Sequence, residues 1–331
     1  MTVRPLPAGA VNRPALRGTG TLLLVAMMAV AVPSTSRLGA SGSAAWRVAR
    51  RGGGDAWSLL LAVLRPRELS PFASGGRGSA WAGVGEGALL PPPANGSPHE
   101  AALARAAEQG WVKCGGAAAC TAALHQARQS LPDELALEAV ALGDPGGDRV
   151  KAAVAAAESA GLERPRELSV HAPFLPHADR ARAEEVERVL GLATLWSLQW
   201  PLPNGTRITS PFGERVHPVT GEKKFHDGVD LAAVTGTPLA APAGARVLHV
   251  GQDAVSGTYV VLDHGHQVQS VACHLSEAEV KRGAAVAPGA TYARTGASGR
   301  VTGPHLHYGV RVGGKFVDPA AAAVRRQAAP R

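Results

Sequence analysis

Two short motifs, far apart in the chain of 331 residues, carry side chains of the kinds that bind metal ions. His226 and Asp230 offer an imidazole and a carboxylate four residues apart. His305 and His307 lie in the segment His-Leu-His-Tyr-Gly-Val-Arg-Val, which has the pattern of a β-strand. Because side chains on a strand alternate between two faces, both of these histidines are expected on the same face. If the two motifs form one site, the fold must bring this strand against the earlier segment.

These residue types are typical of a zinc site. A catalytic zinc ion commonly keeps three protein ligands and leaves a fourth position open for water. Two histidines and one carboxylate meet that need, so one histidine of the set is left without a metal to bind. That histidine would lie about 7 Å along the same strand face, from two rises of about 3.3 Å, within reach of water or substrate. Each motif alone is weak evidence, because such short pairs arise by chance in many chains.

Longer phrases around the two motifs make them more specific. The first motif follows Ile208-Thr-Ser-Pro-Phe-Gly-Glu-Arg-Val-His-Pro-Val-Thr-Gly, and the second follows Thr295-Gly-Ala-Ser-Gly-Arg-Val-Thr-Gly-Pro. The phrase Cys273-His274-Leu275 lies between them. From about Leu202 to Pro319, about a third of the chain, the sequence resembles the M23 family of zinc metallopeptidases. These are the lysostaphin-like or LytM-type endopeptidases, which cut peptidoglycan peptides.

The resemblance implies a role for each of five side chains. It gives Zn2+ as the cofactor, with His226, Asp230 and His307 as its ligands. It gives His274 and His305 as the two active-site histidines that do not bind the metal, without dividing the proton transfers between them. The chain has no His-Glu-x-x-His helix, and so it lacks the glutamate base of zincins. An imidazole, with an unperturbed pKa of about 6.5, can take over that proton transfer and can stabilise an oxyanion when protonated.

Other residues of this region are candidates for binding substrate. We expect His217 to line the groove, and Arg300 and Thr302 to bind carbonyl or carboxylate groups of the substrate. The family's usual Tyr-Ala-His-Leu phrase appears here as Ala272-Cys273-His274-Leu275. The missing tyrosine would lie two residues from His274 on the same strand face, so we expect its loss to alter the fit of the substrate more than the binding of metal.

Further side chains are expected to have no part in the chemistry. His264 and His266 flank Gly265 at a turn and are expected to be solvated. Asp227 should point away from the metal if its segment is extended, and Cys273 should be a small buried thiol. The other two cysteines, Cys114 and Cys120, are close enough in sequence to pair if the protein is exported.

The first part of the chain has the composition of an export signal followed by a linker. Three arginines precede the apolar run Thr21–Val32, after which Pro33 and small residues follow. We interpret residues 1–33 as a signal peptide, or as an anchor if it is not cleaved, although the run is shorter than the ~20 residues of a membrane span. Residues 34–97 are rich in Gly, Ala, Ser, Pro and Arg, which predicts a low-complexity linker.

Beyond the linker the pattern changes from helical to strand-like spacing, which predicts an α+β fold. Residues 98–198 are expected to form an α-helical region of unknown role, residues 199–320 a mainly antiparallel β domain with the zinc peptidase site, and residues 321–331 a disordered tail. Ser97, followed by Pro98 and Glu100, predicts the start of a helix. Helices are predicted over 100–109, 117–130, 133–142, 149–160 and 178–196.

Charge narrows the choice of partners. The 34 basic residues exceed the 26 acidic ones, and because only six are lysines, the excess is almost entirely arginine. Arginine suits an anionic cell wall, but a solvated basic surface explains the same composition. We expect no nucleic-acid partner, because no platform of aromatic residues accompanies the basic ones.

Two functions of different class are compatible with the sequence. The first is an exported zinc endopeptidase of the periplasm, cell envelope or extracellular space that hydrolyses stem or cross-bridge peptides of peptidoglycan. The alternative is a non-catalytic envelope module that activates or scaffolds another cell-wall hydrolase, as in relatives that have lost zinc or catalytic histidines. All five positions are filled here, which favours the enzyme. The helical region could be a pro-segment, a wall-targeting module or an arm that docks an envelope partner.

Overall fold

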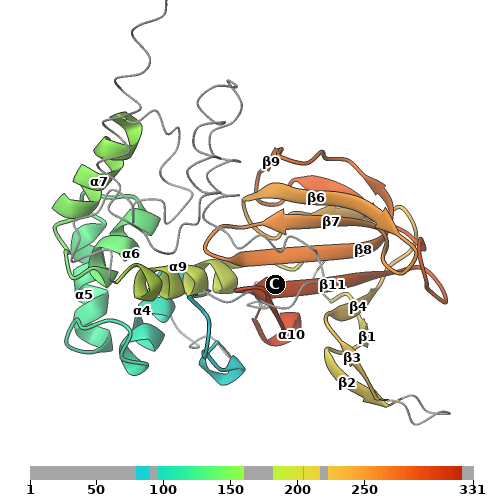
Figure 1. The fold of residues 1–331 in the computed structure, drawn as a ribbon, viewed down its shortest axis with the longest axis horizontal. Helices are drawn as coiled ribbons and strands as arrows, with labels where there is room; N and C mark the ends of the chain where they lie inside the picture. The colour runs from blue at the N-terminus through green and yellow to red at the C-terminus, as the bar shows by residue number, and fades with distance from the viewer. Residues whose placement is uncertain (1–79, 90–95, 160–181, 204, 217–222, 323–331) are drawn as a thin grey trace, which may run out of the picture. The chain divides into compact units, whose positions relative to one another are not determined.

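The computed structural model describes residues 80–89, 96–159, 182–203, 205–216 and 223–322. The predicted signal peptide, most of the predicted linker, His217 and nearly all of the predicted tail lie outside the described residues. The fold is α+β, as predicted, with helices in the N-terminal region and an antiparallel β-sheet in the C-terminal domain (Figure 1).

The described helices begin and end close to the predicted positions. Ser97 caps α4, the first α-helix among the described residues: its Oγ accepts from the Glu100 amide at 3.3 Å, while the Glu100 carboxylate accepts from the Ser97 amide at 3.4 Å. The helix predicted over 117–130 ends at Ala127, because the next residues tighten into bonds of the i to i+3 type. The helical segments are η1 (Glu86–Ala88), α4 (Pro98–Glu108), α5 (Ala117–Ala127), α6 (Asp133–Ala141), α7 (Asp148–Ser159), α9 (Ala183–Ser197) and α10 (Pro319–Ala322).

The helical region has an apolar core between α4, α5, α6 and α9. Leu103, Leu124 and Trp196 are fully buried in it. Trp81 is also buried there, and the Trp196 indole donates to the Leu89 carbonyl at 3.0 Å, so the packing includes residues from the segment predicted to be a linker. A disulfide between Cys114 and Cys120 closes the loop that leads into α5. Among the described residues, none of the helices combines the length and the apolar character needed to cross a membrane.

The C-terminal domain is built around one antiparallel sheet, whose strands follow the order β1-β4-β11-β8-β7-β6-β9. Strand β10 pairs with β5 and β8, β12 pairs with β11, and β2 and β3 form a separate hairpin. The strands are β1 (Ile208–Ser210), β2 (Gly213–Val216), β3 (Lys223–His226), β4 (Val229–Ala232), β5 (Pro238–Ala240), β6 (Ala245–Asp253), β7 (Gly257–Asp263), β8 (Val268–Ala278), β9 (Ala285–Val286), β10 (Thr291–Thr295), β11 (His305–Val312) and β12 (Lys315–Val317).

Side chains cover both faces of the central strands. One face contributes Leu231, Leu262 and Leu306 to the main core. On β7 and β8 a smaller cluster of Tyr259, Val261, Val271 and Cys273 forms separately from that core. Cys273 is a buried free thiol, as predicted, and burial raises its pKa to about 12, so it is unreactive at neutral pH.

The turn between β7 and β8 lies against helix α9. His266 is buried and its Nδ1 is 3.3 Å from the Glu187 carboxylate of α9, while His264 is half-buried and its pKa is lowered to about 4 by burial. The prediction that both histidines are solvated was therefore wrong. The helix covers the turn so closely that a Cβ atom at Gly191 would lie 2.9 Å from the His266 carbonyl oxygen, a contact between distant segments that local turn chemistry does not reveal.

Candidate metal centre and active site

The pairing of β4 with β11 brings the two predicted motifs together. His307 lies directly opposite Asp230 in the register of these strands, and directly opposite residues on one face of an antiparallel pair are within contact distance. Strand β3 ends at His226, four residues before Asp230, and delivers the third side chain. One pair of strands thus brings together two motifs that are far apart in the sequence.

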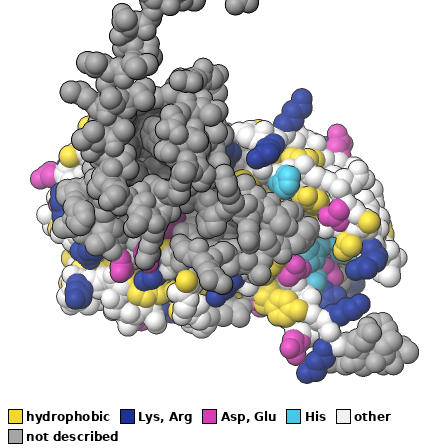
Figure 2. Space-filling view, in the orientation of Figure 1, with side chains coloured by type: hydrophobic (Ala, Val, Ile, Leu, Met, Phe, Trp, Pro, Cys, Tyr) yellow, Lys and Arg dark blue, Asp and Glu magenta, His cyan; other side chains and the backbone are white. Residues whose placement is uncertain are grey.

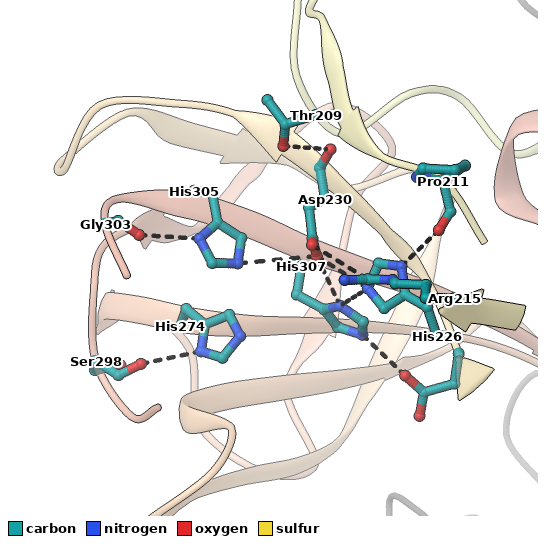
Figure 3. Close-up of polar contacts among 11 residues, drawn as sticks. Thr209, Pro211, Arg215, His226, Asp230, His274, Ser298, Gly303, His305 and His307 are labelled. Atoms are coloured by element: carbon teal, nitrogen blue, oxygen red, sulfur yellow. Dashed lines mark hydrogen bonds and ion pairs between the residues drawn. The ribbon is translucent and has the colours of Figure 1, made fainter. Parts of the chain in front are cut away.

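Three atoms of these side chains form a compact triangle (Figure 3). The Nε2 atom of His226 lies 3.0 Å from Oδ1 of Asp230 and 3.0 Å from Nδ1 of His307, and that Nδ1 lies 3.1 Å from the same oxygen. Ligands at about 2.0–2.2 Å from a tetrahedral zinc ion are separated by about 3.3 Å, so the spacing fits one ion with little adjustment. Among the described residues, these three are the group of side chains able to hold a metal ion.

In three of the imidazoles, a hydrogen bond to a backbone carbonyl group determines which ring nitrogen faces the site. The Nδ1 of His226 donates to the Pro211 carbonyl at 2.7 Å. In the same way, Nδ1 of His274 donates to the Ser298 carbonyl at 3.0 Å, and Nδ1 of His305 donates to the Gly303 carbonyl at 2.9 Å. Because a carbonyl oxygen can only accept, each of these Nδ1 atoms carries a proton, and when the imidazole is neutral its Nε2 has the lone pair that can bind a metal ion or a proton.

The remaining two histidines lie beside the triangle. The ring of His274 is 4.8 Å from that of His305 and 6.1 Å from that of His307, measured between centroids. The Nε2 atom of His305 lies 3.8 Å from Oδ1 of Asp230. All five side chains predicted to act in metal binding and catalysis therefore lie together in the structure.

A β-bulge directs His274 towards the site. Strand β7 pairs Thr258 with Leu275 but Val260 with Ala272, so two residues of β8, Cys273 and His274, face one residue of β7. His274 has a φ of 62°, an uncommon conformation for a residue other than glycine. Its amide donates to the Ser256 carbonyl at 2.8 Å, which holds the bulge in place.

The bulge also corrects the expectation about the missing tyrosine. Ala272, which occupies its position, is buried in the main core and pairs with Tyr308 of β11. Alternation of side chains breaks at the bulge, so residues 272 and 274 do not share a face. An aromatic side chain at 272 would enter the core rather than the groove.

Charge in the site favours ionised carboxylates and a protonated His307 before a metal binds. Burial raises the pKa of Asp230, but hydrogen bonds from His226 and His307 outweigh that effect and hold it well below its ordinary value. Burial disfavours a charge on His307, yet Asp227 and Asp230 together raise its pKa to about 9. The pKa of His274 is lowered, first by burial and then by the neighbouring His305 and His307, so His274 stays neutral at neutral pH.

Two charged side chains next to the ligands were missed by the sequence reasoning. Arg215 of β2 places Nη2 3.3 Å from Oδ2 of Asp230, the oxygen that does not face the imidazoles. Asp227 was expected to take no part in the site, but its Oδ1 lies 3.3 Å from Nε2 of His307. The only signal for either was its place within a motif phrase.

The candidates for substrate binding are less well defined. Arg300 and Thr302 are exposed on the loop that leads from β10 to His305, and the Arg300 amide donates to the Val255 carbonyl at 3.0 Å. Figure 2 shows that histidine side chains reach the surface over the strands, with acidic and basic side chains near them.

Two histidines and one aspartate that could hold a metal ion, with two further imidazoles beside them on an antiparallel sheet, are typical of a metallohydrolase. Residues 224–319 match the sequence model of peptidase family M23, so this part of the chain is similar to that family. The match includes all five site residues and ends at the start of α10.

Curated relatives match about a third of the chain. An uncharacterized metalloprotease of Haemophilus influenzae is 44% identical over 123 residues, which are 37% of this chain and 26% of the relative. The DD-carboxypeptidase/endopeptidase Mpg of Neisseria meningitidis is 39% identical, covering 36% of this chain and 27% of that protein. The peptidoglycan DD-endopeptidase ShyA of Vibrio cholerae is 38% identical, covering 36% and 28%. The match thus spans about a quarter of the length of these relatives.

Among solved structures, a zinc containing peptidase from Vibrio cholerae is similar to this chain. It is 36% identical, covers 37% of this chain and 39% of that chain, and superimposes with a TM-score of 0.36.

Proposed function

We propose that this protein is a zinc-dependent endopeptidase that hydrolyses peptide bonds in the stem or cross-bridge peptides of bacterial peptidoglycan. The observation that carries the proposal is the triangle of Nε2 of His226, Oδ1 of Asp230 and Nδ1 of His307, with the imidazoles of His274 and His305 beside it. The substrate class is supported by relatives whose names describe DD-endopeptidases of peptidoglycan.

The residues present divide the work between metal binding and proton transfer. A Zn2+ ion held by His226, Asp230 and His307 would lower the pKa of water and polarise the scissile carbonyl group. His274 and His305 each hold their Nδ1 proton against a carbonyl, so each can accept the proton of the attacking water at Nε2 and return it to the leaving amine. The lowered pKa of His274 keeps its Nε2 free to accept that proton at neutral pH. When protonated, either imidazole also stabilises the oxyanion that develops on the substrate.

The non-catalytic alternative has less support. An activator needs neither the ligand triangle nor two imidazoles anchored beside it, so the grouping of all five side chains favours an enzyme. The binding of substrate by His217, Arg300 and Thr302 remains part of the proposal.

We infer an exported protein that acts in the periplasm or at the cell envelope. The substrate lies outside the cytoplasm, and the disulfide between Cys114 and Cys120 suits an oxidising compartment. Anchoring by the apolar run Thr21–Val32 is a further hypothesis that concerns residues outside the described ones.

The helical region is more compatible with docking a partner than with blocking the site. Its contact with the sheet through Glu187 and His266 lies beside the start of β8, where Val268 pairs with Val312, the last residue of β11. The site lies at the other end of that strand pair, where His307 pairs with Cys273. The described helices therefore contact the sheet away from the site, which suits a role in docking an envelope protein.

Zinc content and muropeptide release by the purified protein test this function together. We expect about one zinc ion per chain, and cleaved peptides from isolated peptidoglycan that mass spectrometry assigns to one bond type. Loss of both after treatment with a chelator, and recovery on adding Zn2+, would support the metal site. Protein that binds no zinc and releases no peptides, but stimulates another hydrolase, would instead support the non-catalytic module.

A further inference from the structure

Each of the four imidazoles in the site has one nitrogen that faces the site and an outer nitrogen that faces away from it. Among these four, only His307 has its outer nitrogen next to a carboxylate. The outer Nδ1 atoms of His226, His274 and His305 each donate to a backbone carbonyl. The Nε2 atom of His307 instead lies 3.3 Å from Oδ1 of Asp227. This nitrogen is on the opposite side of the ring from Nδ1, the atom that faces Asp230 and His226.

The backbone next to Asp227 fixes this contact. Asp227 is followed by Gly228, which lies so close to the ring of His307 that a Cβ atom there would be 2.9 Å from both Cε1 and Nε2. The same Cβ atom would lie 2.5 Å from the Tyr308 carbonyl oxygen. Only glycine lets the chain pass here, and the close passage carries the Asp227 carboxylate to the edge of the ring.

We infer that Asp227 is a positioning residue, which holds the His307 imidazole with Nδ1 towards the metal. A carboxylate that accepts from the outer nitrogen of a ligand histidine fixes the tautomer and raises the electron density on the inner nitrogen. The side chain of Asp227 is 36% exposed while that of His307 is 12% exposed, so the contact is partly screened from water.

Asp227 is not one of the side chains that would bind the metal ion directly. It faces Nε2 rather than the triangle, and the group of side chains able to hold an ion does not include it. Its loss should therefore weaken zinc binding without abolishing it, whereas loss of a ligand removes the site. Because this role rests on the proposed function, one of its tests must work on the metal-free protein.

Zinc affinity measured by competition with a chromophoric chelator is the first test. We expect Asp227→Ala to weaken zinc binding about 10-fold to 100-fold, in the range of outer carboxylate partners of ligand histidines. Asp227→Asn keeps an acceptor oxygen but loses the charge, so its effect should be intermediate. The control is Glu214→Gln, which removes a carboxylate from β2 that contacts the exposed Lys223 at 3.7 Å. Its zinc affinity should equal that of the unchanged protein.

Proton NMR of the metal-free protein is the second test. The hydrogen-bonded Nε2 proton of His307 should give a slowly exchanging resonance in the unchanged protein and in Glu214→Gln, and none in Asp227→Ala. Zinc affinity within about twofold of the unchanged protein in both Asp227 variants would overturn the inference, as would an unaltered resonance. If Asp227→Ala does not fold, Asp227→Asn, which preserves the shape, decides by the same measurements. If the unchanged protein binds no zinc, the proposed function fails, and the resonance alone decides whether Asp227 holds the ring.

Discussion

Glu187 and His266 form a buried contact of 3.3 Å between helix α9 and the turn that joins β7 to β8. Burial disfavours a charge on His266, but Glu187, with Glu134 and Glu138 nearby, raises its pKa above the ordinary value. The stabilisation by this pair is therefore fully present below about pH 6.5, the ordinary value for histidine, and is lost as the pH rises through the raised pKa of the folded protein.

Replacing Glu187 by Gln should destabilise the protein in a pH-dependent way. At pH 6 the change leaves a buried imidazolium without its partner, and such losses cost about 3–5 kcal/mol. The difference in unfolding temperature from the unchanged protein should shrink between pH 6 and pH 9, as His266 loses its proton. Glu184→Gln is the matched control, because Glu184 is exposed on the same helix and contacts Arg188 at 3.9 Å. Equal pH dependence in the two variants would contradict the pairing.

His305 and His307 share one strand face, but only His307 contributes to the ligand triangle. We therefore expect His307→Ala to lose both zinc and turnover. We expect His305→Ala and His274→Ala to keep zinc and to lose turnover by roughly 100-fold to 10,000-fold, the usual contribution of positioned acid–base groups. Metal analysis and muropeptide release distinguish the two classes of variant. Zinc lost from His305→Ala but kept by His307→Ala would reverse the assignment.

Much of this site could be predicted from the sequence because its motifs resemble those of the M23 family and because part of its geometry follows from regular strands. Period-two alternation places His305 and His307 on one face, and the antiparallel pairing of β4 with β11 then sets Asp230 opposite His307. The orientation of His274 could not be predicted in the same way. It depends on a β-bulge. The position at which a strand contains an extra residue is determined by contacts with neighbouring segments, not by the alternation of side chains along the strand.

Contacts between elements that are far apart in the sequence could not be predicted from the sequence pattern either. The polar residues around Gly265 are typical of an exposed turn, and only the packing of α9 on that turn buries His266. Asp227 is similar, because its position on the outer edge of the His307 ring depends on how closely Gly228 passes that ring. In both cases a glycine allows the close approach, and the chemistry of the neighbouring residue follows from it.

Gly228→Ala should disrupt the site through crowding. The added Cβ atom would lie 2.5 Å from the Tyr308 carbonyl oxygen and 2.9 Å from the His307 ring, closer than real Cβ atoms approach other atoms. Strand β4 must then move away from β11, and with it Asp230 moves away from His307. We expect lower thermal stability and a loss of zinc affinity. Gly85→Ala is the control, since a Cβ atom at Gly85 meets nothing within 4 Å. A Gly228→Ala protein with unchanged zinc affinity would mean that the strands adjust without separating.

Ser298 holds His274 through its backbone and the neighbouring strands through its side chain. Its carbonyl accepts from Nδ1 of His274 at 3.0 Å, while its Oγ donates to the Leu275 carbonyl at 2.7 Å and accepts from the Thr258 amide at 2.9 Å. Ser298→Ala removes the two Oγ bonds that fix this loop next to the bulge, so the carbonyl and the imidazole that it orients should become less well placed.

We expect turnover by Ser298→Ala to fall roughly 10-fold to 100-fold, the effect of a catalytic group displaced by about 1 Å, while zinc content stays at that of the unchanged protein. Combining Ser298→Ala with His274→Ala should cost little more than His274→Ala alone, because the serine acts through the histidine. Ser276→Ala is the matched control, since the Ser276 hydroxyl also joins neighbouring strands, donating to the Thr295 carbonyl at 2.8 Å. Fully additive losses in the double variant would show that Ser298 affects turnover by a route other than His274.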